Sequence, residues 1–212
     1  MKRSTERFAD QDESVSLGYG YAIVIVGTSW GGLDALRMIV SALPPEYELP
    51  TVVVQHRHRD TEALLARLLQ DETKLNVCEI EDKQPIEGGH VFVAPADYHT
   101  MIDKGHFALS VDEPVRYSRP SIDVTMMSAA DAYRHRTVGV VLTGANADGA
   151  RGLRSIADAG GLAVVQQPAT AEVPTMPSAA VKSVPTARVF ALDRIAAFLG
   201  NLPSRHTRAR ST

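Results

Sequence analysis

Runs of apolar residues without polar alternation recur along the chain, and helical patterns separate them. The first run covers residues 21–26, and residues 51–54 and 138–142 have the same character. Strands that are apolar on both faces are typical of a parallel sheet that helices cover on both sides. Residues 33–43 repeat apolar positions at helical spacing and end before Pro44. The pattern therefore predicts strands that alternate with helices.

The remaining patterns extend this alternation to the end of the chain. Lys104 and Gly105 separate two short apolar runs, as in a hairpin turn, and Pro120 and Ser121 open a helical pattern. The fold class we expect is α/β: a doubly wound, mostly parallel sheet with helices on both faces and an antiparallel hairpin excursion. Further strands are expected at residues 76–80, 91–94, 100–102, 106–111, 162–165 and 189–191, and further helices at 64–69, 122–133, 150–156, 177–181 and 195–199.

One domain accounts for nearly all of this pattern. We expect an α/β domain at residues 21–200, which is a sufficient length for one hydrophobic core. Residues 1–20 are charged and lack a hydrophobic period, which predicts a flexible tail. Residues 201–212 are basic and unpatterned, which predicts a second tail.

The composition of the chain excludes several classes of function. Hydrophobic residues make up 44% of the 212 residues and charged residues 22%, as in ordinary globular proteins. The formal net charge of -3 offers no basic field for nucleic acid. No apolar run approaches the about 20 residues of a membrane span, and a single cysteine, Cys78, excludes an intrachain disulfide. We expect a cytoplasmic protein without a nucleic-acid partner and without membrane insertion.

Three chemically complementary residues follow predicted buried strands. Ser29 lies in a glycine-flanked turn between a strand and a helix, a turn that exposes a serine hydroxyl at the edge of a sheet. His56 ends the second strand, and Asp148 lies in a glycine-rich loop after the strand at 138–142. Because the carboxyl ends of parallel strands meet at one edge, the sequence places all three together.

These three residue types fit nucleophilic catalysis. A serine needs an imidazole to accept its proton, and the imidazole needs a carboxylate to hold it. We expect Ser29, His56 and Asp148 to fill these roles, and the backbone N–H groups of Trp30 and Ala145 to bind the oxyanion. Taken singly, each has a structural alternative: an ordinary turn, a surface histidine and a helix cap.

Other site types fit less well. His56 and His58 could share a metal, but no third ligand is apparent, and we expect none. The turn is related to a dinucleotide-binding loop, yet Ser29 stands where that loop has its second glycine. Arg119 is either a solvated charge or an anion contact.

Five motifs in register point to one family. They are residues 25–32, 54–56, 93–99, 119–123 and 141–150. In this order they resemble the CheB-type chemotaxis methylesterases, over about residues 21–199. The resemblance implies a doubly wound α/β fold without metal or organic cofactor. It also implies an enzyme that removes methyl groups from glutamate methyl esters on the cytoplasmic domain of bacterial chemoreceptors, releasing methanol; several members also deamidate glutamines.

The resemblance assigns the nucleophile to Ser29, the histidine to His56 and the aspartate to Asp148. The chain departs from the family at Trp30, where a small residue or threonine is common, and at residues 57–58, where Met-Pro is usual. It also has Ala145 and Asn146 in place of methionine and glycine.

Trp30 and Arg57 motivate an alternative, a non-catalytic binding module that has kept the fold and lost the reaction. A nucleotide-binding domain is a weaker alternative. About twenty residues precede the first strand, whereas a domain needs about 100. We therefore expect the stand-alone form without a receiver domain, regulated by a separate partner or not at all.

Overall fold

A seven-stranded parallel sheet forms the centre of the protein. The computed structural model describes residues 20–57 and 64–203. The strand order is β3-β4-β2-β1-β7-β8-β9, and every neighbouring pair is parallel. The strands are β1 (Ile23–Thr28), β2 (Thr51–Gln55), β3 (Asn76–Glu79), β4 (His90–Val93), β7 (Thr137–Val141), β8 (Leu162–Gln166) and β9 (Arg188–Phe190).

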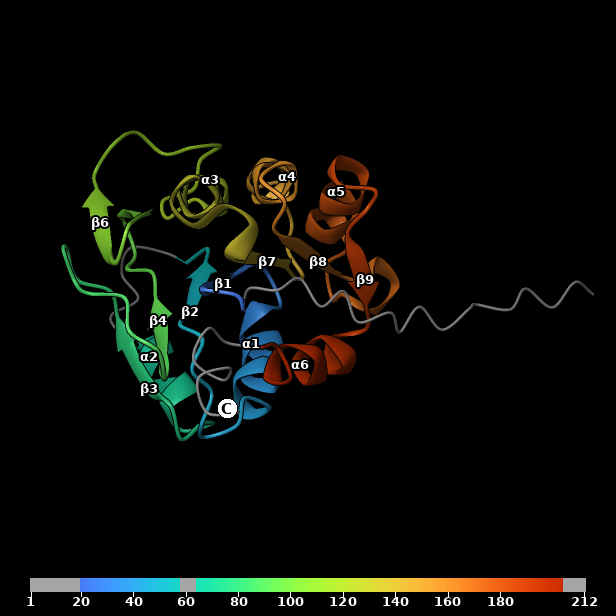
Figure 1. Cartoon of the computed structure of the whole chain (residues 1–212). Helices are drawn as coiled ribbons and strands as arrows, with labels where there is room; N and C mark the ends of the chain where they lie inside the picture. The colour runs from blue at the N-terminus through green and yellow to red at the C-terminus, as the bar shows by residue number, and fades with distance from the viewer. Residues whose placement is uncertain (1–19, 58–63, 204–212) are drawn as a thin grey trace, which may run out of the picture.

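Helices cover both faces of this sheet (Figure 1). On one face lie α1 (Gly32–Ser41), α2 (Leu64–Gln70) and α6 (Leu192–Gly200). On the other lie α3 (Ile122–Tyr133), α4 (Ala150–Asp158) and α5 (Thr175–Ser183), together with the antiparallel hairpin of β5 (His99–Asp103) and β6 (His106–Ser110). Two short 3₁₀ turns, η1 (Arg134–Arg136) and η2 (Pro168–Thr170), link these elements.

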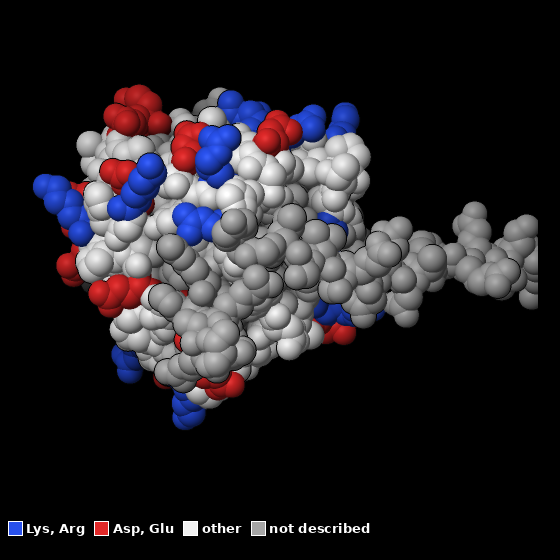
Figure 2. All heavy atoms as spheres, in the orientation of Figure 1, with Lys and Arg blue, Asp and Glu red and all other residues white. Residues whose placement is uncertain are grey.

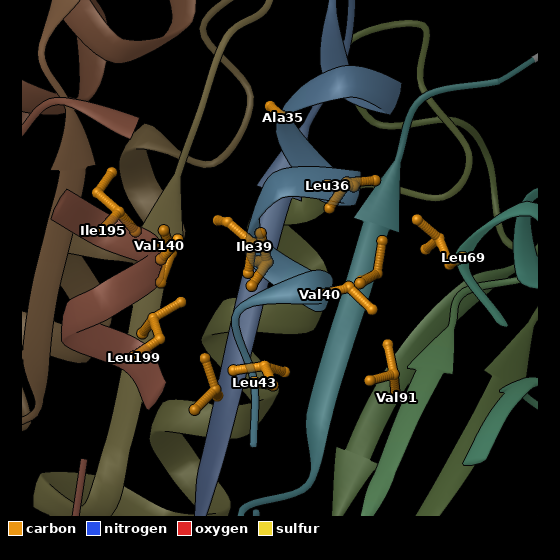
Figure 3. Close-up of a cluster of buried hydrophobic side chains, with 14 of the residues drawn as sticks. Ala35, Leu36, Ile39, Val40, Leu43, Leu69, Val91, Val140, Ile195 and Leu199 are labelled. Atoms are coloured by element: carbon orange, nitrogen blue, oxygen red, sulfur yellow. The ribbon is translucent and has the colours of Figure 1, made fainter. Parts of the chain in front are cut away.

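The sheet separates two hydrophobic cores. Alternate residues of β1 serve opposite faces: Val24 and Val26 belong to one core, and Ile23 and Ile25 to the other. Figure 3 shows the first core, where side chains of α1 pack against the strands and against α2 and α6. Both faces of β1 are therefore buried, which explains why its sequence has no polar alternation.

The predicted fold class is confirmed, including the helices on both faces and the antiparallel hairpin. The boundaries differ by a few residues. The first strand runs from Ile23 to Thr28 because its pairing with β2 continues as far as Thr28 and Gln55. The last helix begins at Leu192, three residues before the apolar positions that predicted it. The domain limits near residues 20 and 200 stay a prediction.

The topology creates a switch point beside β1. From β1 the chain moves through β2 to one edge of the sheet, and it later returns to the other side of β1 as β7. The loops that follow β1, β2 and β7 therefore meet at the carboxyl edge, where ligands bind in sheets of this kind.

The described surface carries both signs of charge. On the face shown in Figure 2, lysine and arginine side chains are interspersed with aspartate and glutamate. Within residues 20–57 and 64–203, none of the helices is long and apolar enough to cross a membrane.

Candidate active site

A tight turn after β1 presents Ser29. Gly31 adopts a positive φ of 74° and caps α1, and the N–H of Gly32 donates to the carbonyl of Ser29 at 3.0 Å. The positive φ disfavours other residues at Gly31, and a Cβ there would lie 2.5 Å from the carboxylate of Glu172, which would have to move. The turn places Ser29 at the N-terminus of α1, where the helix dipole favours negative charge.

Thr143 ties this turn to the glycine-rich loop. Its carbonyl accepts hydrogen bonds from the Ser29 N–H at 3.0 Å and from the Thr28 hydroxyl at 2.9 Å. Its own hydroxyl donates to the carbonyl of Trp30 at 2.9 Å and accepts from the N–H of Val173 at the same distance. Two segments more than a hundred residues apart in sequence are thereby held in one arrangement.

His56 joins the same edge from β2. Its N–H donates to the carbonyl of Thr28 at 3.2 Å, which fixes the histidine beside the end of β1. Its Nε2 lies 2.8 Å from Oδ2 of Asp148. Because an ionised carboxylate only accepts hydrogen bonds, Nε2 carries the proton and the lone pair is on Nδ1.

Asp148 is fully buried at the N-terminus of α3. Its Oδ2 accepts from His56 and from the N–H of Ile122 at 2.7 Å. Its Oδ1 accepts, at 3.0 Å each, from the hydroxyl of Ser121 and the N–H groups of Asp123 and Gly149. The carboxylate therefore caps α3 rather than only the helix that follows it in sequence.

The surroundings of Asp148 keep it ionised. Burial raises the pKa of this carboxyl, but the hydrogen bond and the charge of His56 lower it, as do the N–H groups of Asp123 and Ile122. The lowering effects are larger in sum, so the pKa of Asp148 lies below its ordinary value.

Ser29 and His56 line the same pocket, which has a volume of about 330 Å³. Trp30 forms another wall. Its indole is 68% exposed and donates from Nε1 to Glu172 at 3.1 Å. The bond to Glu172 thus holds a largely exposed indole beside the pocket.

The two N–H groups predicted to bind an oxyanion are not used elsewhere in the described part of the chain. Neither Trp30 nor Ala145 donates a backbone hydrogen bond to another described residue. Ala145 lies exposed in the loop that also carries Asp148. Both groups are thus available to a ligand, and their role as oxyanion donors stays a prediction.

Sequence reasoning missed several residues that shape the site. Asn146 contacts His56, with Nδ2 3.4 Å from Nδ1, and its Oδ1 accepts from the N–H of Asp148 at 3.0 Å. Ser121 and Glu172 reach the site from distant segments, and only the motif at 119–123 signalled the first of them. Arg119 pairs with Asp97 at 2.7 Å and also donates to the carbonyls of Val111 and Asp112.

The metal alternative gains no support. Among residues 20–57 and 64–203 no group of three or more histidine, cysteine, aspartate or glutamate side chains is arranged to hold a metal. His58, the second histidine of that alternative, lies outside the described residues.

Comparison with known proteins identifies the family. The family described as CheB methylesterase matches residues 24–199. The chain belongs to the CheB methylesterase family. The crystal structure of the Thermotoga maritima CheB methylesterase catalytic domain superposes with a TM-score of 0.80 at 32% identity, over 84% of this chain and 97% of that one. The predicted family and the prediction of an ester hydrolase are confirmed.

Relatives of this CheB-family chain differ in length. A protein from Leptospira interrogans is 41% identical over 83% of this chain and 92% of its own length. The protein-glutamate methylesterase/protein-glutamine glutaminase 1 of Carboxydothermus hydrogenoformans is 39% identical, and the match covers 84% of this chain but 54% of that protein. The chain thus spans nearly all of the first relative and about half of the second.

Proposed function

We propose that the chain is a serine hydrolase that removes the methyl group from glutamate γ-methyl esters of a bacterial chemoreceptor. The products are methanol and a glutamate side chain. Relatives named protein-glutamate methylesterase/protein-glutamine glutaminase support this proposal and extend it to the deamidation of glutamines. The substrate is the methylated cytoplasmic domain of the receptor, so the enzyme acts in the cytoplasm. A separate regulatory partner stays a prediction.

In the proposed mechanism Ser29 attacks the ester carbonyl. As its oxygen bonds to the carbonyl carbon, its proton moves to Nδ1 of His56, the nitrogen that carries the lone pair. Asp148 holds Nε2–H and stabilises the imidazolium that forms. The hydrogen bond of 2.8 Å between these two side chains is the observation that carries the proposal.

The tetrahedral intermediate then collapses. Its oxyanion binds the N–H groups of Trp30 and Ala145, near the N-terminus of α1. The bond to the methoxy oxygen breaks as His56 returns the proton to it, and methanol leaves. Water attacks the acyl-enzyme by the same steps in reverse, which releases glutamate and the free serine. With a glutamine substrate, ammonia leaves in place of methanol.

The test compares two serine variants of α1 and its preceding turn. Ser29→Ala removes the nucleophile, and we expect methanol release from a methylated receptor fragment to fall by at least about 10³-fold. Ser41→Ala is the control, since Ser41 lies at the far end of α1, where its hydroxyl donates to the carbonyl of Met38. Unchanged methanol release in Ser29→Ala would exclude the proposed nucleophile.

Labelling separates the enzyme from the binding module. We expect a fluorophosphonate to modify the unsubstituted chain at Ser29 with a stoichiometry near one, and not to modify Ser29→Ala. The exposed indole at the pocket mouth is the observation that favours a binding role. A serine that stays inert to this reagent, together with an absence of methanol, would favour the non-catalytic module.

A further inference from the structure

A tight turn of unusual composition lies beside the candidate active site. Val115 and Ser118 pair through two hydrogen bonds, each from the N–H of one to the carbonyl of the other, at 3.1 and 3.0 Å. The two residues between them, Arg116 and Tyr117, both have positive φ, at 51° and 66°. Turns with two positive φ values normally carry asparagine, aspartate or glycine at these positions.

Arginine and tyrosine at these positions oppose folding. A side chain in the left-handed region meets its own backbone, and this disfavours the conformation for residues other than glycine. Packing of the side chains does not compensate for this conformational cost, because both side chains are exposed and that of Tyr117 is fully exposed. Within the described chain, neither residue has a hydrogen-bonded side chain or an ion pair. Strain of this kind, where nothing in the fold needs it, indicates a role in binding.

The turn borders a second pocket that shares His56 with the first. This pocket has a volume of about 220 Å³, and His56, Tyr117 and Arg119 are among its lining residues. Arg119 anchors the base of the turn through Asp97 and the carbonyls of Val111 and Asp112. The histidine therefore stands between the pocket of Ser29 and the pocket of the turn.

We propose that Arg116 and Tyr117 form a docking contact for the substrate polypeptide, next to the glutamyl ester that enters the Ser29 pocket. This inference rests on the proposed function. His56 lines both the Ser29 pocket and the second pocket, so a polypeptide that binds with one side chain at Ser29 and continues past His56 reaches the turn. The exposed ring of Tyr117 offers it an apolar surface.

The charge of Arg116 defines the class of segment that binds. Within residues 20–57 and 64–203 no carboxylate pairs with this guanidinium, and in the proposed contact it pairs with an acidic side chain of the substrate. The turn selects an ester flanked by carboxylates over the same ester flanked by neutral residues.

The test replaces the two residues by those that the backbone favours. The double variant Arg116→Asn with Tyr117→Gly removes both side chains and relieves the strain, so we expect its Tm to rise by about 2 °C. Its substrates are two synthetic peptides with one glutamate γ-methyl ester, flanked by glutamates in one and by glutamines in the other. We expect kcat/KM on the glutamate-flanked peptide to fall about tenfold, mainly through KM.

The control is Arg134→Gly. Arg134 also has a positive φ, of 53°, but it ends α3 at the opposite edge of the sheet, before β7. We expect it to stabilise the fold and to leave both peptides unaffected. In the unsubstituted chain and in both variants, the rate of Ser29 labelling by a small fluorophosphonate should be equal, since that reagent needs no docking contact.

Three results would overturn the docking proposal. They are an unchanged kcat/KM in the double variant, an unchanged preference between the two peptides, and a lower Tm, which would show that the turn needs its native side chains. Failure of the proposed function looks different, because the unsubstituted chain would then release no methanol from either peptide, and the docking role would fall with it.

Discussion

At the scale of single residues, the Asp148 carboxylate joins His56 to the N-terminus of α3. It accepts five hydrogen bonds from a fully buried position. Asp148→Asn keeps the size but puts an NH₂ group where N–H donors converge. We expect the free energy of unfolding to fall by about 2–3 kcal/mol at pH 7, and methanol release to fall by about 10³–10⁴-fold because His56 loses its tautomer. Urea denaturation and the methanol assay measure the two effects.

The stability loss should depend on pH. The pKa of Asp148 is lower in the folded chain than in the unfolded one, so its stabilisation is complete above the unfolded value of about 3.9. It is lost as pH falls through the folded value. The difference in the free energy of unfolding between the native chain and Asp148→Asn should therefore become smaller below about pH 4.

An exposed aspartate on α3 provides the matched control. Asp131→Asn should change the free energy of unfolding by no more than about 0.5 kcal/mol at any of these pH values. If the free energies of unfolding of the native chain and of Asp148→Asn differ by the same amount down to pH 2, the assigned ionisation of Asp148 is contradicted.

The three candidate catalytic residues were predictable because each follows a strand with a clear apolar pattern. The role of Asp148 as a cap of α3 was not, since its partners Ser121 and Ile122 lie 27 and 26 residues away in sequence. The hydrophobic periodicity of the sequence does not predict the contacts that Asn146 and Glu172 make. Patterns locate an element, whereas the contact of two polar side chains depends on how the elements pack.

At the scale of elements, the glycine-rich loop between β7 and α4 positions Asp148. Gly149 caps α4 at a φ of 89°, and a Cβ there would lie 2.8 Å from Ile122. Gly149→Ala adds both backbone strain and this collision, which would displace the loop. We expect a loss of about 2–4 kcal/mol in the free energy of unfolding and of most methanol release.

Gly160 is the matched control for this loop. It has a similar φ of 80°. A Cβ at Gly160 would have the Cβ of His135 as its nearest neighbour, at 3.5 Å, so Gly160→Ala adds strain without a collision. We expect it to cost about 1 kcal/mol and to leave methanol release unchanged, because it precedes β8 at the other edge of the sheet. Equal losses of activity in the two variants would show that crowding against Ile122 is unimportant.

Element types followed from the apolar runs more reliably than element ends. The helix expected at residues 177–181 begins at Thr175 and continues to Ser183, because Met176 and Ala180 pack into the core one turn apart. The hairpin was predicted from Lys104 and Gly105, and Gly105 has the positive φ, 89°, of a hairpin turn. Local turn chemistry is readable from sequence, while helix ends depend on tertiary packing.

At the scale of the whole molecule, the sequence predicted the class of sheet but not the order of its strands. Strands such as β1 and β7 are equally apolar, so composition does not say which are neighbours. Contacts between distant segments decide it, as in the parallel pairing of Val26 with Val140. That pairing also determines which loops lie next to each other at the switch point.

Because the sheet separates the two hydrophobic cores, substitutions in one core should change the free energy of unfolding independently of substitutions in the other. Ile39 of α1 is buried in one core, and Ile156 of α4 is buried in the other, with the strands between them (Figure 1). Each change to valine removes one methylene group and should cost about 1 kcal/mol. Because the two residues belong to separate cores on opposite faces of the sheet, the double variant should lose the sum of the single losses to within about 0.5 kcal/mol, as measured by urea denaturation. Since Ile39 and Ile156 lie outside the pocket of Ser29, fluorophosphonate labelling should proceed at the native rate in all three variants. A coupling energy above about 1 kcal/mol would contradict this independence and would mean that strain passes from one core to the other through the strands.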